Sequence, residues 1–343
     1  MTDTLIIGAG LCGLSLAEAL EKAGHDYLLV EGRNRVGGRI LSAPVDLGPS
    51  WFWPGQPRMA ALVKRLGLRR FDQFATGALT FEDQDGAVQR GRGFASMEGS
   101  WRIAGGMAAL TDALAAQLPA ARVHLKAAVV GMQYEEKGVR VEFADRPAIL
   151  ARRVALALPP RIAASLAFNP PLPDAVRATL ADVPTWMAGQ AKAVAIYPTP
   201  FWREAGLSGD AMSRMGPMVE VHDASPEDAS YGALFGFIGV PPAARRDEVA
   251  LRIAMRAQFS RLFEGEPPTS LRIQDWAADP FTATPADAAP LMAHPAYGLP
   301  PAVQSLWDGR LILSGTETAP QFGGFLEGAL EAAEAALRVL EGQ

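Results

Sequence analysis

The stretch TLIIGAGLCG at residues 4–13 lies near the N-terminus, and YLLVE at residues 27–31 follows it after a run of small and apolar residues. This order predicts a strand, a glycine turn, a helix and a second strand that ends in an acid. Gly8, Gly10 and Gly13 form the pattern G-x-G-x-x-G, which allows a tight turn, close approach of the backbone to a pyrophosphate and close helix–strand packing. In this context the pattern predicts a dinucleotide-binding unit.

The end of the second strand narrows the choice of dinucleotide. Glu31 follows the glycine turn by about 20 residues, where an acid accepts hydrogen bonds from the two ribose hydroxyls. An acid at this position disfavours a 2′-phosphate, so NADP is not expected, but the fingerprint alone does not separate NAD from FAD. The predicted helix points its free N–H groups and the positive end of its dipole at the phosphates, so the expected phosphate site includes Leu11 and Cys12.

The segment EGRNRVGGR at residues 31–39 resembles the E-x-R-x-R-x-G-G-R segment of the flavin-containing amine oxidase family. That family contains monoamine oxidases, polyamine oxidases and L-amino-acid oxidases, and related desaturases share the segment. The resemblance implies that FAD is the cofactor, with Glu31 on the adenosine ribose and Arg39 on the pyrophosphate. Arg33 and Gly38 are expected to add a cationic fork and a backbone donor there; a solvated turn is the alternative for the arginines.

Further segments match the family in the same order along the chain. A D-x-G-x-x segment of the family passes under the flavin ring, and its match at residues 46–51 implies a ring site formed by Gly48, Pro49, Ser50 and Trp51. A plain core position is the alternative for Trp51. The family also has a valine whose backbone lies along the adenine, and the resemblance assigns this place to Val129.

The matching segments cover nearly the whole chain of 343 residues and imply its fold class. We expect an α/β protein in which a Rossmann-like FAD-binding domain of the two-dinucleotide-binding type is interleaved with a smaller α+β substrate domain. The FAD-binding parts are expected at residues 1–68, 105–170 and 276–343, and the substrate-domain parts at residues 69–104 and 171–275. The first substrate-domain part is much longer in well-known animal members, so a more open or differently capped active site is expected.

The composition limits the partners of the protein. The net charge is −5 and no basic patch is interleaved with aromatic residues, which gives no indication of binding to nucleic acid or anionic lipid. No uninterrupted apolar stretch of about 18 residues is present, and the first strand begins too early for a signal peptide. We therefore expect a soluble, cytoplasmic protein without a membrane segment; the oligomeric state is not indicated.

Neither a disulfide nor a metal site is expected. Cys12 is the only cysteine, and its place in the glycine turn favours a small packing residue over a nucleophile. The four histidines are scattered, and none has a metal-binding spacing such as H-E-x-x-H.

Two elements are expected in the second part of the substrate domain. The stretch from Trp186 to Tyr197 predicts one long strand. The stretch from about Arg245 to Phe263 predicts a helix, with an apolar face made of Val249, Ile253 and Ala257 and with Phe259 and Phe263 beside it.

Lys192 is the residue that most directly indicates chemistry. It is one of five lysines among 32 basic residues, and it lies in the otherwise apolar segment QAKAVAIY at residues 190–197. A lysine in such a strand either extends its ammonium to solvent or is buried, where a lowered pKa would ready it to exchange a proton. The segment resembles the family strand whose lysine holds a water against flavin N5, which implies a catalytic role for Lys192; a structural lysine is the alternative.

The C-terminal region is expected to complete the flavin site. Gly315 and Glu317 match a family segment beside the ribityl chain and the pyrophosphate, although Glu317 has the alternative role of a helix or loop anchor. The last helix is expected to start near Phe325, and its positive end would stabilise the negative charge of reduced flavin at the N1–C2=O edge. The residues implied at this edge are Gly324, Phe325 and Leu326.

Monoamine oxidases flank the substrate amine with two aromatic rings. Phe325 falls on one of these positions, whereas the other falls near Ala286, where no aromatic residue is present. Phe281 and Phe322 are the candidate substitutes for the missing ring. The family's flavin-flanking tryptophan matches Trp276, for which a core position is the alternative.

The resemblance implies the chemistry of a flavoenzyme with non-covalent FAD, because Pro285 stands where a cysteine tethers FAD in some animal members. We expect oxidation of the C–N bond of a small-molecule amine to an imine by hydride transfer to flavin N5. The reoxidant is then O2 and the product H2O2. Two alternatives stay open: a desaturase or other oxidoreductase of the same fold that acts on a non-amine substrate, and a non-catalytic dinucleotide-fold binding protein.

Overall fold

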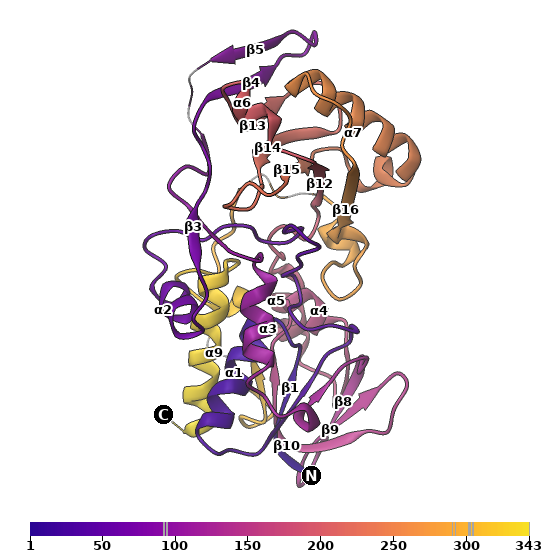
Figure 1. The fold of residues 1–343 in the computed structure, drawn as a ribbon. Helices are drawn as coiled ribbons and strands as arrows, with labels where there is room; N and C mark the ends of the chain where they lie inside the picture. Colours follow the sequence, from indigo (N-terminus) through magenta and orange to yellow (C-terminus); the bar gives the residue numbers. More distant parts are fainter. Residues whose placement is uncertain are drawn as a thin grey trace.

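The computed structural model describes residues 1–91, 93, 95–289, 291, 293–300, 303 and 305–342. These residues form two parts, each built around its own β-sheet (Figure 1). The lower part in Figure 1 contains a nine-stranded sheet and both ends of the chain, and the upper part contains a seven-stranded sheet.

The nine-stranded sheet has a parallel centre. Its strands follow the order β11-β8-β9-β10-β1-β2-β7, and β18 pairs with both β10 and β17. The strands are β1 Thr2–Ile7, β2 Tyr27–Val30, β7 Val123–His124, β8 Val129–Glu135, β9 Gly138–Phe143, β10 Ile149–Leu156, β11 Ala167–Asn169, β17 Ser305–Leu306 and β18 Leu311–Leu313. The central strands are covered on both faces, which explains why β1, β2 and β18 are nearly continuous apolar runs.

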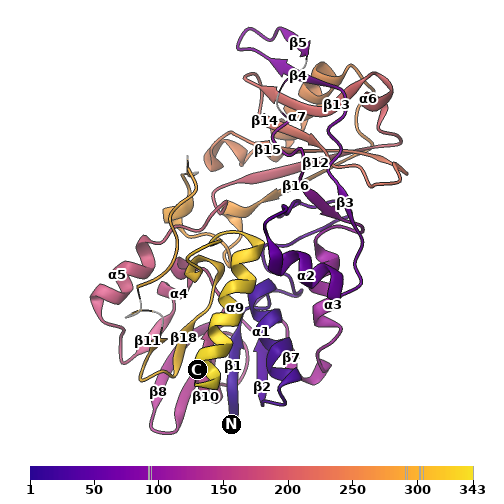
Figure 2. The same ribbon diagram turned by 90° about the vertical axis from the view of Figure 1, so that its left-hand side faces the viewer.

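Helices pack on both faces of this sheet. On one face α1 (Leu11–Lys22) lies beside α9 (Leu326–Glu341), and α2 (Pro57–Arg65) and α3 (Ala108–Ala115) flank the pair (Figure 2). On the other side α4 (Pro160–Ala164) contacts α5 (Asp174–Asp182). Leu180 of α5 joins the buried cluster that contains Leu5 of β1, so this helix packs with the nine-stranded sheet.

The register of the parallel strands decides where a ligand site can form. Ile7 lies opposite both Val30 and Leu156, and Leu156 lies opposite Leu313. The carboxyl ends of four strands therefore lie at one level, and the loop after each strand emerges at the same edge of the sheet. This edge faces the upper sheet (Figure 1), and ligands of open α/β sheets bind at such an edge.

The seven-stranded sheet follows the order β16-β12-β15-β14-β13-β4-β5. Its strands are β4 Ala78–Glu82, β5 Val88–Gly91, β12 Ala191–Tyr197, β13 Leu207–Ser213, β14 Met218–Asp223, β15 Gly232–Ile238 and β16 Ser270–Asp275. The long helix α7 (Glu248–Phe263) and the short α6 (Phe201–Glu204) pack on one face of the sheet. Trp51 of the N-terminal region packs with Val194 and Phe235 on the other face, which turns toward the nine-stranded sheet.

The remaining elements are short. β3 (Arg70–Asp72) and β6 (Trp101–Ile103) form a two-stranded sheet between the two parts. Single 3₁₀ turns are η1 Ala120–Arg122, η2 Pro242–Arg245, η3 Trp276–Ala278, η4 Pro285–Asp287 and η5 Thr316–Thr318. The domain boundaries expected from the sequence stay predictions.

Two expectations about elements are wrong. The strand expected from Trp186 begins only at Ala191, because Met187 adopts a positive φ of 63° and residues 185–190 form a hydrogen-bonded turn. The expected apolar face of α7 is exposed, with Val249 at 70% and Ile253 at 64% relative exposure. The buried face instead carries Leu251, Met255, Phe259 and Leu262. Burying these four side chains removes more apolar area from water than burying Val249, Ile253 and Ala257 would.

Candidate active site

A cavity of about 340 Å³ lies between the two sheets. The loops at the carboxyl edge of the nine-stranded sheet form one wall, and β12 and β15 of the seven-stranded sheet contribute to the other. Most residues expected at the site line this cavity: Gly8, Gly10, Leu11, Cys12, Glu31, Arg33, Gly38, Arg39, Gly48, Pro49, Ser50, Trp51, Lys192, Trp276, Gly315, Gly324, Phe325 and Leu326.

The glycine turn after β1, at residues 8–13, forms a cradle whose surface is backbone rather than side chains. Gly8 has a φ of 103°, and a Cβ there would lie 2.6 Å from the Ala157 carbonyl oxygen. A Cβ on Gly13 would lie 1.9 Å from the Gly8 carbonyl oxygen, so this glycine serves close packing. A Cβ on Gly10, by contrast, would meet no protein atom within 4 Å, and Gly10 lines the cavity. The open side of Gly10 thus fits a pyrophosphate at the N-terminus of α1.

Glu31 is fixed at the end of β2 by backbone donors. The N–H of Ala9 donates to its Oε2 at 2.8 Å, and the N–H of Arg33 donates to its Oε1 at 2.9 Å. The carboxylate is buried yet borders the cavity, which fits an acceptor for ribose hydroxyls. The guanidinium of Arg33 extends to Asp279 at 2.6 Å and lies over the ring of Phe281, and so it ties the nucleotide loop to the segment after β16.

Arg39 and Glu317 meet across the chain. Arg39 Nη1 lies 2.7 Å from Glu317 Oε1, and Glu317 is completely buried. Apart from this ion pair, the Glu317 carboxylate has no hydrogen-bond donor within the part of the chain that the structure describes. Ser50 Oγ at the cavity is also buried without a partner among these residues. The unsatisfied hydroxyl of Ser50, which lines the cavity, fits a site that a polar cofactor completes.

Lys192 projects from β12 into the cavity and is 6% exposed. Its Nζ donates to the Gly48 carbonyl oxygen at 2.7 Å and lies 5.1 Å and 5.4 Å from the ring centroids of Phe237 and Phe235. Burial lowers the pKa of Lys192 to about 8, with the nearby Asp46 carboxylate acting in the opposite direction. The side chain is thus buried rather than extended to solvent, and its ammonium holds the Gly48 loop against the seven-stranded sheet.

Two tryptophans of the cavity wall are both buried and anchored. The indole N–H of Trp51 donates to Gln73 Oε1 at 2.7 Å, and that of Trp276 donates to the Leu47 carbonyl oxygen at 2.9 Å. Each tryptophan therefore occupies a core position and a cavity position at once, because its ring is buried in the protein and also lines the cavity.

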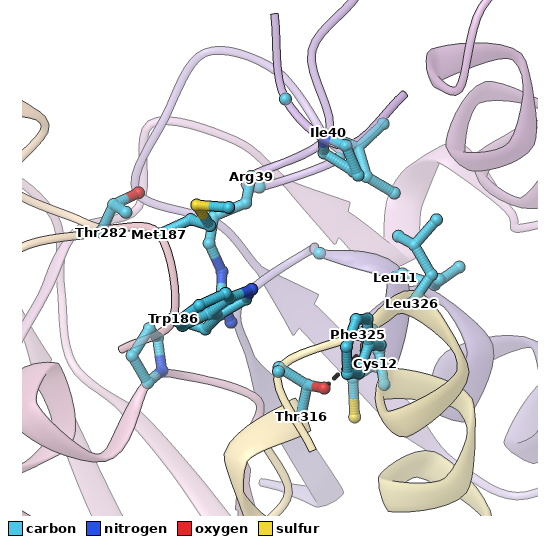
Figure 3. A pocket seen from close by; sticks show the side chains of 18 of the residues that line it. Leu11, Cys12, Arg39, Ile40, Trp186, Met187, Thr282, Thr316, Phe325 and Leu326 are labelled. Carbon is cyan, nitrogen blue, oxygen red and sulfur yellow. Dashed lines mark hydrogen bonds between the residues drawn. The ribbon is translucent and has the colours of Figure 1, made fainter. Parts of the chain in front are cut away.

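Phe325 is the cap of α9 and borders the cavity (Figure 3). Its carbonyl oxygen accepts a hydrogen bond from Thr316 Oγ1 at 2.8 Å, and its ring stacks on His294 at 4.7 Å with an interplanar angle of 14°. Ala286 is exposed in η4 and does not line the cavity, and Phe281 packs on Arg33. Neither Phe281 nor Phe322 pairs with Phe325 among the described ring contacts.

Three of the expected cofactor residues do not line the cavity: Gly13, Val129 and Glu317. Gly13 packs behind Gly8, and Glu317 reaches the site through Arg39. Val129 lies in β8 and packs against the core of the nine-stranded sheet. Its expected contact with adenine stays a prediction.

Several lining residues escaped the sequence analysis. Trp186 and Met187 project into the cavity from the turn before β12 (Figure 3), but the apolar stretch around them indicated a strand. Phe237 enters from β15 because it pairs with Lys192 in antiparallel register, which no local pattern reveals. The remaining ones include Ile40, Trp53, Gln56, Met97 and Thr282.

The described residues contain no group of three or more side chains suited to a metal ion. Cys12 is buried in α1, and its thiol donates to the Ser314 carbonyl oxygen. Burial raises the pKa of this thiol to about 12, so it stays protonated and serves packing. Among the helices that the structure describes, none is long and apolar enough to cross a bilayer.

The nucleotide cradle and the adjoining aromatic chamber with a buried lysine define a dinucleotide-dependent redox enzyme. The sequence model of the flavin containing amine oxidoreductase family matches residues 11–97 and 87–340. The chain therefore belongs to this family, and it is an FAD-dependent oxidoreductase.

Named relatives agree with this assignment. The chain is similar to a putative flavin-containing monoamine oxidase of Mycobacterium tuberculosis, with 27% identity over 448 residues that cover 97% of this chain and 95% of the relative. Putrescine oxidase of Kocuria rosea is 23% identical, covering 71% of this chain and 76% of its own.

Solved structures share the fold. A structure of putrescine oxidase bound to putrescine has a TM-score of 0.81 at 20% identity and covers 100% of this chain and 99% of its own. Cyclohexylamine oxidase from Brevibacterium oxydans has a TM-score of 0.78 at 20% identity, with 99% of each chain covered. The expected fold class is thus confirmed.

Proposed function

We propose that this protein oxidises the C–N bond of a small-molecule amine to an imine, with O2 as the reoxidant and H2O2 as the second product. The observation that carries the proposal is the continuity of one cavity from the nucleotide cradle at Gly10 and Glu31 to the ammonium of Lys192. Family membership supports the same activity. When bound, FAD supplies the acceptor for a hydride equivalent from the α-carbon of the amine.

The nucleotide end of the cavity binds and orients the cofactor. The Glu31 carboxylate would accept hydrogen bonds from the adenosine ribose, and Gly10 would give the pyrophosphate access to the N-terminus of α1. Arg39 would offset phosphate charge, and its ion pair with Glu317 keeps the guanidinium in place. The N-terminus of α9 at Phe325 would present the positive end of the helix dipole to the ring system and would favour negative charge there.

The other end receives the amine. Trp51, Trp276 and Phe237 exclude water and restrict the orientation of the substrate. Lys192 Nζ is suited to give or take a proton near neutral pH, because burial has brought its pKa to about 8. Phe325 stacked on His294 is the proposed aromatic wall beside the amine.

The proposal includes non-covalent FAD. Cys12 is the only cysteine of the chain, and its thiol is held against Ser314 within the buried core. We retain the interleaved domain division at residues 68/69, 104/105, 170/171 and 275/276 as part of the proposal, since segments 78–91 and 191–275 supply the seven-stranded sheet. The cytoplasmic location expected from the sequence stays a prediction.

Anaerobic mixing of the purified yellow protein with a panel of amines tests the function. Loss of flavin absorbance with at least one amine, followed by H2O2 release when air is admitted, is the expected result. A flavin that photoreduces normally but is bleached by no amine would point to a same-fold enzyme for a different substrate. Colourless protein that does not take up FAD would refute the proposal at its first step.

A further inference from the structure

Residues 95–100 form a turn, the wall turn, whose residue Met97 lines the cavity. Met97 packs against the buried cluster that contains Trp51 and Phe235. Within the turn, the N–H and the hydroxyl of Ser100 both donate to the Met97 carbonyl oxygen, at 3.1 Å and 2.7 Å. The turn belongs to neither a helix nor a strand, so contacts with other elements fix its place at the cavity.

Glu220 of β14 holds the first half of the wall turn. Its Oε1 accepts a hydrogen bond from Ser96 Oγ at 2.8 Å, and Ser96 directly precedes Met97. Glu220 lies opposite the cavity residue Phe237 of β15 in antiparallel register, so both side chains stand on the same face of the sheet. Neither Ser96 nor Glu220 is among the described residues that line the cavity. Glu220 therefore contacts the wall turn without reaching the cavity itself.

His222 fixes the orientation of the Glu220 carboxylate. His222 Nε2 lies 3.0 Å from Glu220 Oε1, and its Nδ1 lies 2.7 Å from Asp210 Oδ1. Although burial lowers its pKa, the hydrogen bonds with the two carboxylates raise the pKa of His222 to about 9. At neutral pH both ring nitrogens therefore carry a proton and donate. The ring is buried and meets Trp51 edge-on, with 5.1 Å between the ring centroids, so packing also holds it in place.

Gln73 holds the second half of the wall turn. The N–H of Gln73 donates to the Ser100 carbonyl oxygen at 3.0 Å. Its buried side chain accepts from the indole N–H of Trp51 at 2.7 Å and donates to the Asp223 carbonyl oxygen at 2.7 Å. Asp223 follows His222 in β14, so the contacts that hold the two halves of the turn meet on the same strand.

We propose that Glu220 is a positioning residue for the amine oxidation: it fixes the wall turn through Ser96, so that Met97, together with Trp51, restricts the orientation of the substrate. The inference rests on the proposed function. A hydrogen bond to a carboxylate is stronger than one between neutral groups, and a polar network whose members are paired keeps its side chains in one arrangement. A wall with one arrangement limits the orientations of a bound substrate, and small displacements of the reacting groups lower the rate steeply.

Hydrogen exchange of the FAD-loaded protein, measured by mass spectrometry, tests this contact without any substrate. Glu220→Ala removes the acceptor, and exchange in the peptide that covers the wall turn should become at least about tenfold faster, while exchange in the nine-stranded sheet stays unchanged. Glu220→Gln keeps an oxygen that accepts from Ser96 and should exchange like the wild type. Glu142→Ala is the matched control, because Glu142 is exposed on β9. Unchanged exchange in the wall turn, or equally faster exchange throughout the protein, would overturn the inference.

Stopped-flow reduction of the flavin by phenethylamine then tests the effect on the reaction; another amine of the panel replaces it if phenethylamine does not reduce the wild type. The limiting rate constant of flavin reduction should fall about tenfold in Glu220→Ala and keep its wild-type value in Glu220→Gln. A merely structural role of Glu220 would lower the fraction of active protein and leave this rate constant unchanged, and that result would overturn the inference.

If Glu220→Ala does not fold, Ser96→Ala decides, because it removes the same hydrogen bond by deleting one oxygen atom. It should likewise speed exchange in the wall turn and slow flavin reduction, and wild-type values of both would refute the role of Glu220. Failure of every amine to reduce the flavin is a different outcome. It refutes the amine oxidation itself, whereas the exchange result still decides whether Glu220 fixes the wall turn.

Discussion

Replacing Lys192 by methionine tests whether the ammonium group at the cavity is buried. Methionine keeps the length of the side chain and removes its charge. Lys192 is 6% exposed, and its Nζ donates to the Gly48 carbonyl oxygen at 2.7 Å. Burial lowers its pKa from 10.5 to about 8, so the unfolded chain binds the proton more tightly than the folded protein does.

The magnitude follows from these two pKa values. One pKa unit corresponds to about 1.4 kcal/mol, so the difference between 10.5 and about 8 destabilises the wild type by about 3 kcal/mol below pH 8. Loss of the hydrogen bond to Gly48 offsets about 1 kcal/mol of the gain. Lys192→Met should therefore stabilise the fold by about 2 kcal/mol at pH 7. Wild-type stability rises with pH between about 8 and 10.5, and the advantage of the variant disappears across this window.

Guanidinium unfolding of both FAD-loaded proteins at pH 7 and pH 10 measures this difference. Stopped-flow mixing of the reduced proteins with O2 then measures the rate of reoxidation. This rate should be about 100-fold lower in the variant if Lys192 transfers a proton during that step. Lys22→Met is the matched control, because the Lys22 side chain is 55% exposed and pairs with Glu18 on the surface of α1. A variant that is less stable than wild type by the same amount at both pH values would show that the ammonium is solvated. Unchanged reoxidation would remove Lys192 from the chemistry.

Three further predictions follow from the packing. Gly10→Ala should keep the thermal midpoint of the apoprotein but retain less FAD, because the added Cβ points into the cavity. Gly13→Ala should lower both the thermal midpoint and the FAD content, since its Cβ lies 1.9 Å from a backbone oxygen. Thermal unfolding and flavin absorbance measure these two quantities, and equal behaviour of the two variants would contradict the assigned cradle. Cys12 should react with a thiol reagent only after unfolding, because burial raises its pKa to about 12, and rapid labelling of native protein would argue against this. Ile253→Lys should change the free energy of unfolding by less than about 0.5 kcal/mol, while Met255→Ala should lower it by about 2–5 kcal/mol. Denaturant unfolding measures both changes, and changes of similar size would contradict the assignment of the buried face of α7.

The nucleotide end of the site was within reach of sequence reasoning. The three glycines of residues 8–13, the acid at Glu31 and the basic segment up to Arg39 lie within forty residues of the chain. Each encodes a local backbone requirement, such as the positive φ of Gly8 or the strand end that presents Glu31 to two backbone donors. Local requirements of this kind leave a pattern that a motif can capture.

Sequence reasoning predicted only part of the substrate end of the site. Lys192 stood out because an ammonium in an apolar strand is unusual, but its partner, the Gly48 carbonyl, lies 144 residues away. The turn at Met187 has the composition of a strand, so the sequence predicted a strand there. Helix α7 carries apolar residues on two faces, and periodicity alone did not identify the face that is buried. The stacking of Phe325 on His294 had no local signal.

The sequence by itself determined the cofactor-binding unit, because a phosphate cradle is a matter of backbone conformation within a few consecutive residues. Only the tertiary structure decided the chamber beside it. Its walls come from strands and loops far apart in the chain, and their rotation and register depend on the packing of the whole sheet. The contacts of His222 with Asp210, Glu220 and Trp51 arise in this way, and no spacing in the sequence specifies them.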